Sequence, residues 1–366
     1  MKVKAAVAWE GRTRFVIEEL ELSEPGPGDI LVRVVGAGLC HTDVKALQGS
    51  MRVPKPMVLG HEGAGVVEWI GAEVGKVKPG DPVVLTYDSC GVCTACRRGN
   101  PAYCKETSAL NFQDARQKEP GFFRKGNDLI HGHFFGQSSF STYAIARPQN
   151  TIPVPQDVPL DIFGVLGCSV QTGAGAIMNS LAAKQGESLA VFGVGPVGLS
   201  AVLAAVACGL SEIVAVDLLE SRLAIAKRIG ASCAVRAGPG VRAGEEIRRL
   251  IPGGVTCALD TTGRAESYHQ ALLSLATKGR FGFVTVPSDP FEPNLAQMML
   301  GGHTLRGIVQ GDSVPDTFIP RLIDLYRRGR FPFDQFVTKY RFDEINQAVK
   351  DQASGTVVKP VFTFST

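Results

Sequence analysis

The stretch Gly193-Val194-Gly195-Pro196-Val197-Gly198 decides the fold of this chain. An apolar run at 188–192 leads into it, and an apolar segment at 199–210 follows it. This order predicts a strand, a glycine turn and a helix, the context in which a G-x-G-x-x-G match becomes informative. Glycine tolerates positive φ and lets backbone N–H groups approach a pyrophosphate at a helix N-terminus. We therefore predict a dinucleotide-binding turn formed by Gly193, Gly195, Pro196, Val197 and Gly198; the alternative is a packing turn in an α/β domain.

Strands and helices alternate after about residue 169, whereas the earlier residues turn often and read as an irregular, mostly β domain. The alternation predicts a doubly wound parallel sheet. A chain of 366 residues is also too long for one ordinary core, so we expect two domains. The expected strands are 188–192, 212–217, 232–235, 256–260 and 280–286, and the expected helices are 197–208, 220–229, 244–250 and 265–277.

Composition and charge exclude several classes of protein. A formal net charge of +3 gives no argument for nucleic acid or an anionic membrane as a partner. The longest apolar stretch, 197–210, is too short to span a bilayer, and no targeting segment is visible. We expect a cytoplasmic protein that acts on a small molecule. Four of its nine cysteines crowd between Cys90 and Cys104, which in a reducing compartment indicates metal ligation.

The crowded cysteines have the spacing Cys90-x2-Cys93-x2-Cys96-x7-Cys104. Four thiolates in a short loop can surround one Zn²⁺ tetrahedrally. No position then remains for a substrate, so this pattern predicts a structural zinc site. The alternatives are four unrelated buried cysteines or a redox role for the C-x-x-C pairs, although the βαβ context of a redox pair is missing.

A second set of donors is dispersed along the chain: Cys40, His61 and Cys168. Two cysteines and one histidine form a known catalytic zinc set that leaves the fourth position open. A water or alcohol bound there becomes easier to deprotonate. Each residue also has an ordinary alternative, as a small core cysteine or as a histidine that caps a turn.

Asp217 closes the second expected strand of the alternating region, about twenty residues after Gly198. An acid at this place can accept hydrogen bonds from the adenosine ribose, and its charge would repel a 2′-phosphate. This favours NAD over NADP. Arg222 could reach the same ribose or could be a solvated helix charge.

Taken together, these motifs carry a family resemblance. Cys40-His41-Thr42-Asp43, Gly60-His61-Glu62-Gly63, the four-cysteine pattern, Cys168 and the glycine turn with Asp217 occur in one order. The chain resembles the zinc-containing medium-chain alcohol dehydrogenases over nearly its whole length. The resemblance implies a GroES-like, mostly β catalytic domain at 1–169 and 310–366, with an NAD-binding Rossmann domain inserted at 170–309.

The resemblance also implies roles for single residues. Cys40, His61 and Cys168 would hold the catalytic zinc, with Glu62 close behind as an occasional ligand. Thr42 would contact the alcohol oxygen, His41 and Lys359 would face the cofactor pyrophosphate, and Thr172 would lie near the nicotinamide. Lys45 departs from the pattern, because many members have a proton-relaying histidine there. We favour a surface charge at Lys45, with protons leaving through the ribose hydroxyl and water.

Within the family, the stretches 85–90, 134–140 and 166–172 resemble the bacterial benzyl (aryl) alcohol dehydrogenases. We expect reversible oxidation of a primary, aromatic alcohol with NAD and two Zn²⁺ per chain. Phe134, Leu110 and Tyr87 would line the substrate pocket, unless they are ordinary core residues. Allylic terpene alcohols, aliphatic alcohols and a thiol adduct of formaldehyde are alternative substrates, and a non-catalytic NAD-binding scaffold is the alternative outside enzymes. A polar surface excursion at 105–132 resembles the dimeric members, so we expect a homo-oligomer, a dimer rather than a tetramer.

Overall fold

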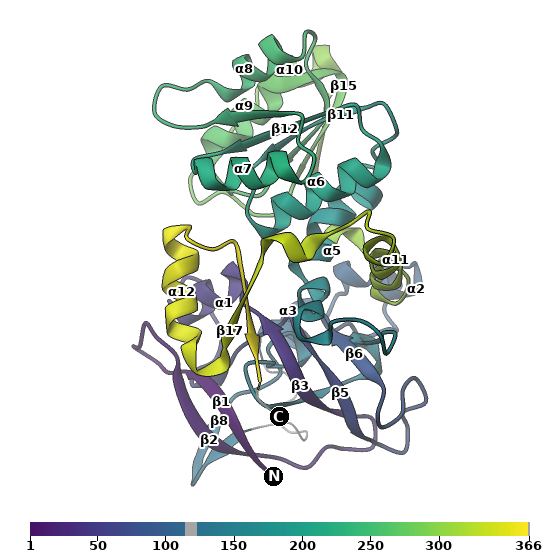
Figure 1. The fold of residues 1–366 in the computed structure, drawn as a ribbon, viewed down its shortest axis with the longest axis vertical. Helices are drawn as coiled ribbons and strands as arrows, with labels where there is room; N and C mark the ends of the chain where they lie inside the picture. The colour runs from purple at the N-terminus through teal and green to yellow at the C-terminus, as the bar shows by residue number, and fades with distance from the viewer. Residues whose placement is uncertain (114–122, 365–366) are drawn as a thin grey trace. The chain divides into compact units, whose positions relative to one another are not determined.

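The computed structural model describes residues 1–113 and 123–364, and the chain divides into two compact units (Figure 1). The first unit comprises Met1–Cys168, Val314–Pro320 and Val337–Thr366. The second comprises Ser169–Ser313 and Arg321–Phe336.

Two β-sheets build the first unit. One sheet has the strand order β4-β1-β2-β7-β8, and the other has the order β10-β6-β5-β3-β18-β17, with β9 also paired to β3. The bounds of the first sheet are β1 (Lys2–Ala8), β2 (Val16–Leu22), β4 (Met57–Val58), β7 (Phe123–Lys125) and β8 (Asp128–Ile130). Those of the second are β3 (Ile30–Gly38), β5 (Gly63–Ile70), β6 (Pro82–Leu85), β9 (Tyr143–Ala146), β10 (Thr151–Pro153), β17 (Val337–Arg341) and β18 (Lys359–Thr363).

Short helices connect the strands of the first unit. The α-helices are α1 (His41–Leu47), α2 (Thr94–Arg97), α3 (Thr107–Phe112), α4 (Leu160–Phe163) and α12 (Ile345–Ser354). The 3₁₀ helices are η1 (Pro101–Tyr103), η2 (Phe134–Gly136), η3 (Pro148–Asn150), η4 (Gly164–Gly167) and η8 (Phe342–Glu344). β18 pairs antiparallel with the end of β3, Val361 opposite Gly38, which brings the C-terminal strand beside the segment that leads to Cys40.

The second unit is a parallel sheet in the order β13-β12-β11-β14-β15-β16, with helices on both faces (Figure 1). Its strands are β11 (Ser188–Phe192), β12 (Glu212–Asp217), β13 (Cys233–Arg236), β14 (Val255–Asp260), β15 (Leu275–Phe283) and β16 (Thr304–Gly307). Its helices are α5 (Ser169–Gly175), η5 (Ala176–Ser180), α6 (Pro196–Cys208), α7 (Glu220–Arg228), α8 (Ala243–Leu250), α9 (Ala265–Ser274), α10 (Leu295–Gly301), η6 (Gln310–Asp312) and η7 (Phe333–Phe336); α11 (Pro315–Arg327) has residues in both units. The predicted fold class, a doubly wound parallel sheet with a mostly β partner, is confirmed.

The predicted strand at 280–286 and helix at 265–277 are partly wrong. β15 begins at Leu275, so α9 ends at Ser274. Leu275 pairs with Val255 and is buried in the sheet, and a register shift follows before Arg280 pairs with Cys257. The burial of an apolar residue on the sheet therefore outweighed the helical pattern.

The predicted domain boundaries differ from the units in the C-terminal third. Residues 310–313 and 321–336, which we assigned to the first domain, belong to the second unit. Local contacts give the reason. Gln310 accepts a hydrogen bond from Thr172 of α5, and Arg330 donates one to the carbonyl of Ala207 in α6.

The predicted surface excursion at 105–132 is only partly irregular, because it contains α3 and the antiparallel pair β7–β8. Residues 114–122 of that excursion lie outside the described residues. In the described part of the chain, no single helix is long and apolar enough to cross a membrane. The bent pair 160–167 and 169–180 has sufficient length and apolar character only when the two helices are counted together.

The glycine turn lies between β11 and α6, beside the point where the strand order reverses from β11 to β14, the usual ligand-binding edge of such sheets. Gly193 has φ +85° and Gly195 caps α6, whose first residues are Pro196, Val197 and Gly198. A Cβ on Gly198 would overlap the carbonyl oxygen of Gly193, whereas a Cβ on Gly195 would meet nothing within 4 Å.

These two glycines allow a matched stability test. We expect Gly198→Ala to lower the free energy of unfolding by about 1–3 kcal/mol, because the methyl group displaces the turn. The backbone at Gly195 has φ −72°, and a Cβ there would lie in open space. Gly195→Ala should therefore change the free energy of unfolding by about 0.5 kcal/mol or less. Urea unfolding without added cofactor measures both; equal stabilities would contradict the close packing at Gly198.

Candidate active site

Four potential metal ligands from three separate segments converge in the first unit. The ligand atoms of Cys40, His61, Glu62 and Cys168 all lie within 4.8 Å of one another. Cys40 is the N-cap of α1, His61 and Glu62 precede β5, and Cys168 follows η4. His61 and Glu62 are completely buried, with 0% of their surface exposed. The three predicted zinc ligands are therefore neighbours in space, together with the predicted nearby Glu62.

Glycines permit this convergence. A Cβ on Gly38 would overlap the Glu62 carboxylate, and a Cβ on Gly164 would overlap the Glu62 carbonyl oxygen. Gly167, next to Cys168, packs in the same way against the carbonyl of Leu85. Three backbone segments thus approach more closely than any side chain would allow.

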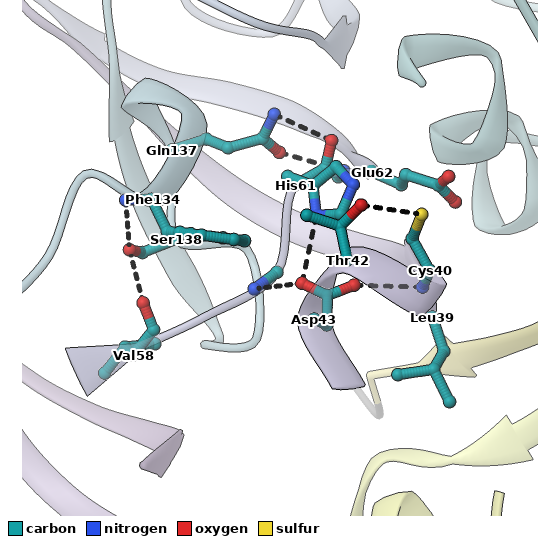
Figure 2. Close-up of polar contacts among 12 residues, drawn as sticks. Leu39, Cys40, Thr42, Asp43, Val58, His61, Glu62, Phe134, Gln137 and Ser138 are labelled. Atoms are coloured by element: carbon teal, nitrogen blue, oxygen red, sulfur yellow. Dashed lines mark hydrogen bonds and ion pairs between the residues drawn. The ribbon is translucent and has the colours of Figure 1, made fainter. Parts of the chain in front are cut away.

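Asp43 fixes two of the donors. Its Oδ1 accepts hydrogen bonds from His61 Nδ1 (2.9 Å) and Gly60 N (3.1 Å), and its Oδ2 accepts one from Cys40 N (2.9 Å). Figure 2 shows the carboxylate between the imidazole and the amide of Cys40. Asp43 belongs to the Cys40-His41-Thr42-Asp43 motif, but the sequence predicted no role for it. The available signal was its place three residues after Cys40, from which a carboxylate can reach back to the N-cap N–H of a helix.

The Asp43 bond leaves His61 Nε2 for another partner. In the neutral imidazole, which is the form that binds a metal ion, Nδ1 carries the proton donated to Asp43 and Nε2 presents its lone pair. Nε2 is buried and has no hydrogen-bond partner among the described residues. A buried polar atom without a partner is costly, whereas an imidazole nitrogen beside two thiols suits Zn²⁺. The donor set therefore fits a zinc ion bound by Cys40, His61 and Cys168.

The electrostatics of the site also fit a cation. A hydrogen bond from Cys168 lowers the pKa of the Cys40 thiol well below its usual range, against the effect of burial, and the same bond raises that of Cys168 well above it. Burial lowers the pKa of His61, but the negative charges of Asp43 and Cys40 outweigh it and raise the pKa to about 10. Negative charge thus gathers where a divalent cation would lie.

Lys359 supplies the buried positive charge of the described site. It is fully buried, forms an ion pair with Glu62 and donates a hydrogen bond to the carbonyl of Leu39 (2.9 Å). Burial lowers the pKa of Lys359, but the Glu62 carboxylate outweighs it and the pKa is raised. Burial also raises the pKa of Glu62, against the charge of Lys359. The expected contact of Lys359 with a pyrophosphate stays a prediction.

Thr42 and His41 lie on the first turn of α1, directly after Cys40. Thr42 Oγ1 is 3.7 Å from Cys40 Sγ, so its hydroxyl borders the donor cluster. His41 is exposed, and partial burial of its ring together with the charge of Lys45 lowers its pKa. Their predicted contacts with the alcohol oxygen and the pyrophosphate stay predictions.

The four predicted structural ligands, Cys90, Cys93, Cys96 and Cys104, also have their sulfur atoms within 4.8 Å of one another. Cys90 Sγ accepts a hydrogen bond from Cys93 N (3.3 Å), and Cys104 Sγ accepts one from Cys90 N (3.3 Å). Backbone N–H donors at Cys96 and Lys105 lower the pKa of Cys93 to about 6. Burial, together with the side-chain hydrogen bond shared with Cys93, raises the pKa of Cys96 to about 12. Four sulfurs held by backbone donors fit a closed Cys₄ zinc site.

Aromatic rings pack against the imidazole of His61. The ring of Phe135 stacks on the imidazole at a centroid distance of 4.3 Å, and Phe134 meets it edge-on at 5.5 Å. Phe135 was missed, although it directly follows Phe134. Leu110 lies on α3, which packs against η2 and its Phe134. Tyr87 is buried in the hydrophobic core of this unit. Whether Phe134, Leu110 and Tyr87 line a substrate pocket stays a prediction.

Asp217 holds the glycine turn of the second unit. Its Oδ2 accepts a hydrogen bond from Val194 N (2.8 Å), its Oδ1 accepts one from Leu219 N (2.9 Å), and Arg222 Nη1 lies 3.9 Å away. Sequence reasoning missed Thr261, whose hydroxyl donates to the carbonyl of Gly193 (2.8 Å). The predicted ribose contacts of Asp217 and Arg222 and the nicotinamide contact of Thr172 stay predictions.

Removing the Asp43 bridge should weaken metal binding. Asp43→Asn has one oxygen for three donors, so its NH₂ group must face at least one N–H. We expect about 10- to 100-fold weaker zinc affinity, the usual cost of losing a partner of a metal ligand. Competition with a chelator measures the affinity. Asp29→Asn, which alters another buried carboxylate of the same unit, is the control; similar losses in both variants would refute a specific role for Asp43.

Comparison with known protein families gives two matches. Residues 26–156 match the alcohol dehydrogenase GroES-like domain, and residues 196–328 match the zinc-binding dehydrogenase domain. The first match covers Cys40, His61 and the four-cysteine loop, and the second begins at the N-terminus of α6.

Individual relatives match over the whole chain. Geraniol dehydrogenase from Castellaniella defragrans is 41% identical over 100% of this chain and 98% of its own length. The crystal structure of an alcohol dehydrogenase zinc-binding domain protein from Burkholderia ambifaria is 46% identical with a TM-score of 0.96. That of benzyl alcohol dehydrogenase from Acinetobacter calcoaceticus is 42% identical with a TM-score of 0.95, and each structure matches 100% of both chains. The chain therefore belongs to the zinc-containing medium-chain alcohol dehydrogenase family.

Proposed function

We propose that the protein oxidises a primary, aromatic (benzyl-type) alcohol to its aldehyde, reversibly and with NAD. Its family makes it a zinc-dependent alcohol dehydrogenase with a nicotinamide cofactor. The observation that carries the proposal is the convergence of Cys40, His61 and Cys168 around the buried His61 Nε2, for which the described residues offer no hydrogen-bond partner. In this proposal the first unit is the catalytic domain and the second binds the cofactor.

Two zinc ions per chain belong to the proposal, one held by Cys40, His61 and Cys168 and one by Cys90, Cys93, Cys96 and Cys104. A zinc ion at the first set would act as a Lewis acid that eases deprotonation of the alcohol. The hydroxyl of Thr42, next to Cys40, accepts that proton and passes it toward the ribose hydroxyl and water. Lys45 takes no part in this relay, in keeping with its partly exposed position.

Other residues hold the cofactor in this proposal. Gly193, Gly195 and Gly198 let the backbone approach the pyrophosphate, and the first turn of α6 directs its N–H groups toward it. His41 and Lys359 add positive charge on the same phosphates. Thr172 contacts the nicotinamide, and Asp217 contacts the adenosine ribose with Arg222 beside it. A nicotinamide bound there would accept the hydride that leaves the alcohol carbon, chemistry that the cofactor itself supplies.

An aromatic substrate is supported by the rings of Phe112, Phe134 and Phe135, which pack on one another beside His61. Leu110 and Tyr87 complete the proposed apolar wall. The similarity to geraniol dehydrogenase favours an allylic terpene alcohol as the second candidate. In both candidates the carbon that bears the hydroxyl is bonded to an unsaturated carbon, so the aldehyde product is conjugated.

We also propose a homodimer. Four large apolar side chains of the second unit are more than two-thirds exposed: Val286, Leu295, Met299 and Leu300. The last three lie on α10. A helix that exposes several large apolar side chains in this way is typical of an interface.

A substrate panel tests the aromatic assignment. With NAD and zinc-replete enzyme, kcat/KM for benzyl alcohol should exceed that for ethanol by about 10- to 100-fold, the value of burying a phenyl ring. Geraniol and the glutathione adduct of formaldehyde complete the panel. A benzyl alcohol value no higher than that of ethanol would disprove the aromatic reading, and a higher value for geraniol would replace it with the allylic one.

Cofactor preference tests Asp217. We expect Asp217→Ala to raise the ratio of kcat/KM with NADP to that with NAD by about tenfold or more, because a like charge facing the 2′-phosphate is removed. Asp217→Asn is the matched variant, since its remaining oxygen can still accept the hydrogen bond from Val194 N. If both variants keep the wild-type ratio, the carboxylate does not select NAD.

A further inference from the structure

Gln137 is a buried amide whose three hydrogen bonds all go to the backbone around the candidate zinc ligands. Its Oε1 accepts from Gly63 N (3.0 Å), and its Nε2 donates to the carbonyls of His61 (3.1 Å) and Thr86 (3.0 Å). Only 1% of its surface is exposed. Figure 2 shows its carboxamide beside the segment of His61 and Glu62. The amide orientation follows from its partners, since a flipped amide would set oxygen against two carbonyls.

Two of these hydrogen bonds hold the backbone of the residues on either side of Glu62, which are His61 and Gly63. The backbone of the ligand His61 and that of Gly63 are held by opposite ends of one planar group. Neither end can move without breaking a bond that water cannot replace at this depth. The amide thereby fixes the direction in which His61 and Glu62 leave the backbone.

The third bond extends the link to the segment of Cys168. Thr86 accepts from Gln137 through its carbonyl, and its own hydroxyl donates to the carbonyl of Gly167 (2.7 Å). Gly167 is the residue before Cys168. A chain of side-chain hydrogen bonds therefore runs from His61 through Gln137 and Thr86 to the segment of the other ligand, Cys168. Asp43 makes the corresponding link from His61 to Cys40.

The segment that carries Gln137 is itself held in an unusual conformation. His133, Phe135 and Ser138 have φ of +60°, +54° and +51°, values that non-glycine residues rarely adopt. Ser138 secures the segment, because its hydroxyl donates to the carbonyl of Val58 (2.6 Å) and accepts from Phe134 N (2.9 Å). Such strain persists only where the surroundings determine it, and it concentrates at functional sites.

We propose that Gln137 is a positioning residue that sets the spacing between His61 and Cys168 and so controls how tightly the zinc ion is held. The inference rests on the proposed catalytic zinc at Cys40, His61 and Cys168. Gln137 does not touch the metal; it acts through the backbone of His61 and, by way of Thr86, of Gly167. Its loss should loosen the ligand set even where the fold survives.

The test uses Gln137→Met, which keeps the length of the side chain and removes all three bonds, and Gln137→Glu, which keeps an acceptor for Gly63 N but sets a carboxylate against two carbonyls. We expect zinc release to a chromophoric chelator to be about 10- to 100-fold faster in both. With Co²⁺ in place of zinc, the visible absorption of the site should shift. Cys168→Ser, which removes one ligand, defines the signal of the four-cysteine site for subtraction.

The second link gives an independent pair. Thr86→Val removes the hydroxyl bonded to Gly167 and should speed zinc release in the same direction, and Thr86→Ser should restore the wild-type rate. This pair keeps the proposal open to refutation if the Gln137 variants do not fold. Asn346→Leu is the matched control, because it removes two side-chain bonds to the backbone of Phe15 in the same unit. It should leave release and spectrum unchanged.

The outcomes separate this inference from the proposed function. Two zinc ions in the wild-type chain, with one lost in Cys168→Ser, establish the metal site. Wild-type protein without that zinc would overturn the proposed function itself. If the wild type holds it but the Gln137 and Thr86→Val variants release it at the wild-type rate, with only lower melting temperatures, Gln137 is an ordinary core amide and the inference is wrong.

Discussion

The candidate active site depends on three hydrogen bonds to one buried carboxylate, that of Asp43. They join the start of α1 to the loop before β5, and so bring Cys40 beside His61. A buried carboxylate is costly unless its oxygens are paired, so this arrangement persists only while all three donors stay in place. Hydrogen bonds from the side chains of Gln137 and Thr86 extend this network to the segment of Cys168. The candidate metal ligands are therefore held in place by side chains outside the candidate ligand set.

Charge balance explains why so many ionisable groups tolerate burial in one place. Asp43, Glu62 and the Cys40 thiol bring negative charge into a buried site, and Lys359 offsets part of it. A divalent cation would supply the positive charge that the protein side chains do not provide. It also gives His61 Nε2 the partner that it lacks among the described residues. The geometry and the electrostatics of the site both fit a divalent cation, and the family of the chain is one that uses zinc.

The second unit also uses side-chain hydrogen bonds to hold a backbone segment, in this case the glycine turn. Asp217, at the end of β12, accepts a hydrogen bond from Val194 N and so ties the glycine turn to the neighbouring strand. Thr261, after β14, holds the carbonyl of Gly193 from the other side. In both units a polar side chain that follows or ends a regular element secures a backbone segment rich in glycine. Glycine lets these backbone segments pack closely, and the hydrogen bonds restrict the conformational freedom that glycine would otherwise give them.

Much of the fold and of the site could be predicted from the sequence, because strong local patterns carry them. The alternation of apolar strands and helices predicted the parallel sheet, and β11 and β12 have the predicted bounds. The predictions failed where contacts between residues distant in sequence determine the structure. Leu275 joins β15 instead of extending α9, and residues 321–336 pack with the second unit. Residue types alone left the donors Cys40, His61 and Cys168 open to ordinary alternatives, and the family resemblance of the ordered motifs assigned them to one zinc site; the structure brings the three residues together. Only the tertiary structure showed which side chains hold these three donors, since the hydrogen-bond partners of Asp43 and Gln137 come from strands and loops far apart in the chain. The physical reason is that a buried hydrogen bond stabilises the site only where its donor and acceptor meet in space.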